Sequence, residues 1–69
     1  MISERLDRLV DEMVTRGVQF EDAVHEFEKR FIAKVLASSE GSLTRTADTL
    51  GIHRNTLTRK MVEYKLRKR

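Results

Sequence analysis

The sequence predicts an all-α protein built from four helices. Apolar residues recur at intervals of three and four along most of the 69-residue chain, which is the period of a helix with a buried face. Three glycines divide the chain into segments of helical length, and no proline interrupts them. No segment shows a competing strand pattern, so one small helical domain is expected.

The first helix is expected between Ser3, a good N-cap residue, and Gly17, which ends it. This spacing predicts an amphipathic helix whose apolar positions are Leu6, Leu9, Val10, Met13 and Val14.

The second helix, from about Phe20 to Ser38, is apolar on two sides in its second half. Ile32 and Leu36 lie nearly opposite a stripe formed by Val24, Phe27, Phe31 and Val35. One side can pack on the last two helices of the same chain, whereas the other needs a further partner. That partner is either the first helix alone or a second copy of the chain. We favour a homodimer in which two copies of the first two helices form a four-helix core.

The last third of the chain predicts a helix-turn-helix. Ser42 caps a short third helix, and Gly51 supplies the left-handed turn that ends it. Ile52 fills the corner, and a fourth helix runs from about His53 to Lys65. The two helices would pack through Leu43, Ala47, Leu50, Leu57, Met61 and Tyr64. Such a pair can lay its second helix in the DNA major groove.

The outer face of the fourth helix distinguishes this interpretation from an ordinary hairpin of two helices. Asn55, Thr58, Arg59 and Val62 point away from the apolar side, and Arg54 projects from the first turn. Asn and Arg side chains make bidentate contacts with adenine and guanine edges. These residue types at this spacing favour base recognition over a merely solvated face.

Charge is distributed unevenly along the chain. Residues 1–34 hold eight acidic and six basic residues, a net charge of −2, whereas residues 35–69 hold three acidic and eight basic residues, a net charge of +5. The positive potential lies on the helix-turn-helix half, where phosphates would bind. The three basic residues at 67–69 either contact phosphate or stay solvated.

Other function classes find little support in the sequence. Without cysteine there is no disulfide or thiolate metal site, and the two histidines lack metal-ligand spacing, so neither a metal nor a cofactor is expected. No pair of reactive groups indicates an enzyme, and Glu26 and Glu28 are expected to make surface pairs such as Glu26 with Arg30. No membrane span or signal peptide is present, which makes the cytoplasm, at the nucleoid, the expected location.

At these residues the chain resembles the Fis family (factor for inversion stimulation). The similarity lies in the run Thr44-Arg45-Thr46-Ala47, Leu50-Gly51-Ile52, Arg54, Thr56-Leu57, Lys60-Met61 and Tyr64, and in Phe20 to Ile32 upstream. The resemblance implies intertwined first and second helices in a dimer, and DNA bending with partial readout of a narrow central minor groove. The helix-turn-helix that ends NtrC-class activators is equally similar, so the chain is alternatively such an output domain.

Departures from the family qualify these expectations. No β-hairpin segment precedes the first helix, which makes contact with a recombinase doubtful. Lys65 replaces the usual glycine, so the fourth helix is expected to run on. His53 replaces an asparagine and would either contact phosphate or cap the helix, while Asn55 replaces a glycine and adds a side chain that can reach a base.

The sequence thus predicts a dimerisation region at 1–40 and a DNA-binding region at 41–69. The partners are double-stranded DNA and a second copy of the chain, with RNA polymerase or a recombinase as further candidates, and the role is that of a transcriptional regulator or nucleoid-associated protein. A protein-interaction module without DNA binding is the alternative of another class. Base contacts are expected from Arg54, Asn55 and Arg59. Phosphate contacts are expected from Ser42, Thr44, Arg45, His53, Thr56, Thr58 and Lys60. The dimer interface is expected to comprise Leu6, Leu9, Val10, Met13, Phe27, Phe31, Ile32 and Leu36.

Overall fold

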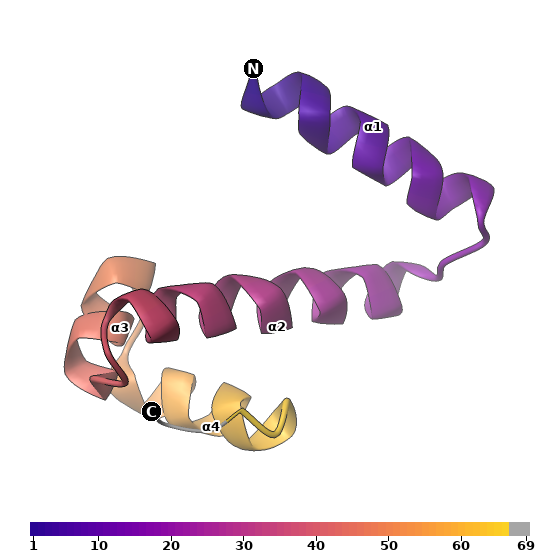
Figure 1. Ribbon diagram of the computed structural model, residues 1–69. Helices are drawn as coiled ribbons and strands as arrows, with labels where there is room; N and C mark the ends of the chain where they lie inside the picture. The colour runs from indigo at the N-terminus through magenta and orange to yellow at the C-terminus, as the bar shows by residue number, and fades with distance from the viewer. Residues whose placement is uncertain (67–69) are drawn as a thin grey trace.

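The computed structural model describes residues 1–66 of the protein. These residues form four α-helices (Figure 1). They are α1 (Ile2–Thr15), α2 (Phe20–Ser38), α3 (Leu43–Leu50) and α4 (Arg54–Glu63). No strand occurs among the described residues, so the all-α prediction is confirmed. None of the helices described is long and apolar enough to cross a membrane.

The buried core joins the second half of α2 to the helix-turn-helix. Ile32 and Leu36 of α2 pack in one cluster with Ala47 of α3 and with Leu57 and Met61 of α4. Partly buried side chains close this cluster at its edges, namely Leu43, Leu50, Ile52, Tyr64 and Leu66. The core therefore spans the expected division at residue 40.

This core determines which apolar side of α2 is left open. Ile32 and Leu36 are only 4% and 5% exposed within a single chain, so they have little surface to offer a second chain. Phe27 and Phe31 remain 56% and 49% exposed, with their ring centroids 5.3 Å apart. Ile32 and Leu36 therefore belong to the core of the chain itself and not to the dimer interface expected from the sequence. Of the α2 positions expected there, Phe27 and Phe31 remain available.

Helix α1 diverges from the rest of the chain. Residues 16–19 join it to α2, and from this connection the two helices diverge as an open V (Figure 1). No residue of α1 is buried, although its apolar positions lie along one stripe. The exposed members of that stripe include Leu6, Leu9, Val10 and Val14, while Met13 is partly covered. Within one chain, α1 thus leaves uncovered the apolar side of α2 that carries Phe27 and Phe31.

Two helix ends differ from the sequence predictions. Helix α1 begins at Ile2 with Met1 as its N-cap and no side-chain cap bond, so Ser3 lies inside the helix. Helix α4 does not run on, because Lys65 adopts a left-handed conformation with φ of 57°. The Leu66 amide then donates to the Met61 carbonyl at 2.9 Å, and Leu66 packs on the core. This is the hydrogen bond and hydrophobic contact of a Schellman end, formed here without glycine.

Candidate nucleic-acid interface

The first helix of the helix-turn-helix is fixed at its start by Ser42. The Ser42 side-chain oxygen accepts a hydrogen bond from the Arg45 amide at 3.3 Å, as the sequence predicted for a cap. Its carbonyl accepts a second bond from the buried Thr46 hydroxyl at 2.6 Å. Thr44 and Arg45 are exposed beside this cap. The Ser42 hydroxyl proton and the Arg45 guanidinium are thus donors near a helix N-terminus, an arrangement suited to a phosphate.

The turn between the helices depends on backbone conformation rather than on a lack of space. Gly51 has φ of 75°, and apart from Gly51 and its two chain neighbours no residue has an atom within 4 Å of the position that a Cβ would take there. Glycine is favoured because other residues resist the left-handed region. The Ile52 amide donates to the Ala47 carbonyl at 3.1 Å, and the half-buried Ile52 side chain packs on the core.

His53 caps α4 through its side chain. Its Nδ1 atom accepts a hydrogen bond from the Asn55 amide at 3.0 Å. In this state Nδ1 carries no proton, so Nε2–H is the available donor. The sequence left open whether His53 caps the helix or contacts phosphate, and in the structure it caps the helix. A phosphate contact stays a prediction that is compatible with the cap, because it would use the other ring nitrogen.

The exposed face of α4 carries the predicted base-contact residues. Leu57 is fully buried and Met61 nearly so, which fixes the inner side of the helix. On a helix with 3.6 residues per turn, the side opposite presents Asn55, Thr58, Arg59 and Val62, all exposed, while Arg54 is exposed in the first turn. Thr56 is half-buried beside the cap. The three predicted base-contact residues are therefore accessible, and all lie on one helix whose opposite side is fixed in the core.

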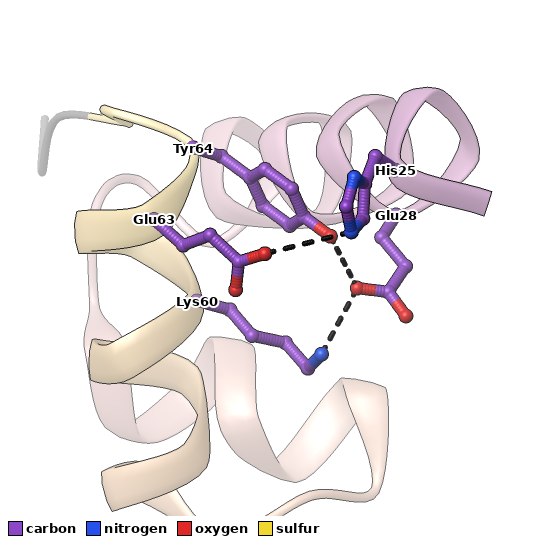
Figure 2. A network of polar contacts seen from close by, with 5 residues as sticks. All are labelled: His25, Glu28, Lys60, Glu63 and Tyr64. Carbon is purple, nitrogen blue, oxygen red and sulfur yellow. Dashed lines mark hydrogen bonds and ion pairs between the residues drawn. The ribbon is translucent and has the colours of Figure 1, made fainter. Parts of the chain in front are cut away.

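Lys60 differs from the other predicted phosphate contacts. Its Nζ atom lies 2.9 Å from Oε1 of Glu28 on α2, and its side chain is 27% exposed (Figure 2). The same carboxylate oxygen accepts a hydrogen bond from the Tyr64 hydroxyl at 2.6 Å. Glu28 was expected at the surface, but it joins α2 to α4. Glu26 pairs with Arg30 at 3.3 Å, as predicted.

Two further side chains extend this network. The His25 and Tyr64 rings meet edge to face with centroids 5.8 Å apart. His25 Nε2 lies 3.6 Å from Glu63 Oε2, an ion pair when the imidazole is protonated (Figure 2). The only acidic residue of α4 is thus directed toward α2.

The hydrogen bonds to Glu28 shift two acid–base equilibria. The Tyr64 hydroxyl, followed by the Lys60 ammonium, lowers the pKa of the Glu28 carboxyl because both stabilise its ionised form. Burial, followed by the hydrogen bond to Glu28, raises the pKa of the Tyr64 phenol. Glu28 is therefore a carboxylate and Tyr64 a neutral donor at neutral pH.

A signal for this network was present in the sequence. Glu28 lies four residues before Ile32, which lies four before Leu36, so the carboxylate shares a helix side with two core residues. Lys60 and Tyr64 are also four residues apart, which places both on one side of α4. An acid aligned with a buried stripe needs a partner. The three basic residues at 67–69 lie outside the described residues.

Comparisons with known proteins agree with this architecture. A sequence model described as "Bacterial regulatory protein, Fis family" matches residues 23–64, which span most of α2 and all of α3 and α4. A Fis-like DNA-binding protein of Xylella fastidiosa is 46% identical over 43 residues, which are 62% of this chain and 48% of the relative. This chain thus spans about half the length of that curated relative. No solved structure matches the chain. Because the family match covers more than half of the sequence, the chain belongs to the Fis family of bacterial regulatory proteins.

Proposed function

We propose that this protein is a homodimeric, sequence-preferring DNA-binding protein that bends its site and acts as a transcriptional regulator or nucleoid-associated protein. The observation that carries the proposal is the exposed face of α4. Arg54, Asn55 and Arg59 are all accessible on a helix that is capped by His53 and anchored from behind by Leu57. Such a helix can enter the major groove with its base-reading side outward.

Phosphate contacts would fix the register of the helix on DNA. Ser42, Thr44 and Arg45 lie at the start of α3, while His53, Thr56 and Thr58 lie in the turns around the start of α4. Helix N-termini favour anions, so donors there can bind the DNA backbone on both sides of the groove. The net charge of +5 on residues 35–69 supports the same placement.

The homodimer accounts for the uncovered apolar surface. The side of α2 that carries Phe27 and Phe31 is open, and α1 presents Leu6, Leu9 and Val10 to solvent. Two copies of these surfaces would bury one another and would place two recognition helices about a two-fold axis. A short separation between those helices would require the DNA to bend, so that part of the sequence preference comes from its deformability.

The first test is selection of the bound fraction from random-sequence DNA, followed by binding measurements at several salt concentrations. If the dimer neutralises roughly six to ten phosphates, log K should fall with log salt at about −0.9 per contact. Binding that barely responds to salt, or no binding at low salt by the folded protein, would favour a role in protein interaction instead.

The second test separates base reading from phosphate binding. Arg54→Ala should cost roughly 1–3 kcal/mol per half-site and should flatten the preference at one base pair of the selected site. Arg30→Ala is the matched control, because Arg30 is an exposed arginine on α2 whose side chain pairs with Glu26. Equal losses on selected and random DNA would show that Arg54 binds only the backbone.

A further inference from the structure

One carboxylate oxygen of α2 holds α4 at two points. Glu28 Oε1 lies 2.9 Å from the Lys60 ammonium and 2.6 Å from the Tyr64 hydroxyl (Figure 2). Lys60 and Tyr64 are one helical turn apart, so both bonds act on the same side of α4. Two directional bonds on one side of a helix restrain rotation about its axis further than the packing of Leu57 and Met61 does alone.

Rotation of α4 bears directly on base recognition. Arg59 is the neighbour of Lys60 in the sequence, yet it points outward because each residue turns the helix by about 100°. A roll of about 20° would move a group at the helix surface by about 2 Å, given a helix diameter of about 10–12 Å. Hydrogen bonds to base edges tolerate only a few tenths of an ångström. Whatever fixes the roll of α4 therefore also fixes the reach of its arginines.

The pairing also occupies the charge of Lys60. Glu28 and Lys60 are 31% and 27% exposed, and a charge-assisted bond between partly covered groups is among the stronger polar contacts. By contrast, Arg45, Arg54 and Arg59 are exposed and make no ion pair within the described part of the chain. For Lys60 to bind a phosphate, it would have to leave Glu28 or share its charge with it.

We propose that Glu28 is a positioning residue for base recognition, which holds Lys60 and Tyr64 and thereby sets the roll of α4. Lys60 is then a structural anchor between helices rather than the phosphate contact that the sequence indicates. This inference rests on the proposed DNA-binding function and adds a residue that does not touch DNA to the determinants of its specificity.

The first measurement is the salt dependence of DNA binding by Lys60→Met, in which methionine keeps most of the apolar stem. An anchor contributes nothing to counterion release, so the slope of log K against log salt should match that of the wild type. A phosphate contact would instead make the slope shallower by about 0.9 per bound subunit, and this result would overturn the proposal.

The second measurement is the ratio of affinities for selected and random DNA in Glu28→Met, which removes the acceptor oxygen of both bonds, made where circular dichroism shows the variant to be folded. Loss of the fixed roll should lower this ratio by about fivefold or more, since one bidentate base contact is worth about 5- to 150-fold in affinity. Glu26→Met is the matched control: it makes the same substitution on the same helix at a residue that pairs with Arg30, and its ratio should stay at the wild-type value.

Tyr64→Phe provides an independent variant if Glu28→Met fails to fold. It removes only the hydroxyl and should lower the ratio in the same direction. The proposal would be overturned if the ratio of affinities for selected and random DNA equals that of the control in each of the two variants, at Glu28 and at Tyr64, that folds. Absence of DNA binding by the wild type would overturn the proposed function together with this inference. Wild-type binding combined with a shallower Lys60→Met slope would overturn the inference alone.

Discussion

Phe31→Ala should dissociate the proposed homodimer without unfolding the helix-turn-helix. Phe31 is 49% exposed in a single chain, although it belongs to an apolar stripe. A phenylalanine side chain buries roughly 200 Å², so about 100 Å² remains for a second chain to cover. At about 25 cal/mol per Å² this is at most about 2.5 kcal/mol per chain and about 5 kcal/mol per dimer. The dissociation constant should therefore rise by up to about three and a half powers of ten.

Sedimentation equilibrium over a range of protein concentrations measures this change, and circular dichroism reports the helix content of the same samples. Two matched variants define the result. Ile32→Ala removes a side chain that is only 4% exposed, so it should cost roughly 2–5 kcal/mol of the free energy of unfolding instead. Val62→Ala alters an exposed apolar residue of α4 and should leave assembly unchanged. A Phe31→Ala variant that dimerises as tightly as the wild type would refute the assignment of this surface.

Two further predictions concern stability. Because the pKa of Glu28 is lowered in the folded protein, the unfolded chain binds a proton at this carboxylate at a higher pH than the folded one does. The free energy of unfolding should therefore fall as the pH drops below about 4.5. Glu28→Gln should remove this contribution to the fall in an acid titration. An acid limb of equal size in both proteins would contradict this. Lys65→Gly should raise the free energy of unfolding by roughly 0.5–1 kcal/mol in chemical denaturation, because glycine adopts positive φ without the cost that lysine bears at 57°. An unchanged or lower free energy of unfolding would contradict the view that the positive φ of Lys65 costs stability at the C-terminal end of α4.

Local signals were sufficient to predict the helices and most of their ends. The Ser42 cap and the Gly51 turn both depend on residue types that form one local geometry, so they could be identified without knowing the rest of the structure. The core positions Leu57 and Met61 followed from helical spacing in the same way.

Choices between equivalent local patterns could not be predicted. Helix α2 has two apolar sides, and periodicity cannot say which one packs on the same chain, so Ile32 and Leu36 were placed with Phe27 and Phe31. The end at Lys65 depends on where Leu66 packs, which is a tertiary contact that outweighs the backbone preference of lysine.

The Glu28 network was missed for a related reason. Its partners lie 32 and 36 residues away along the chain, so no window of local sequence contains both ends of either contact. Only the alignment of Glu28 with the buried stripe at 32 and 36 indicated that this acid faces the core side.

The divergence of α1 would make its folding depend on the concentration of the protein if two chains associate. A helix of 14 residues with no buried side chain is only marginally stable in water, because the cost of nucleation is hardly repaid over that length. If a second copy supplies the missing contacts, mass action governs whether residues 2–15 are ordered. We expect their amide protons to exchange rapidly with solvent in dilute solution and to become protected as the concentration rises, while the amides of Leu57 and Met61 stay protected throughout. Proteolytic cleavage near Gly17 would follow the same dependence, so the dimer would shield its own amino-terminal helix from degradation.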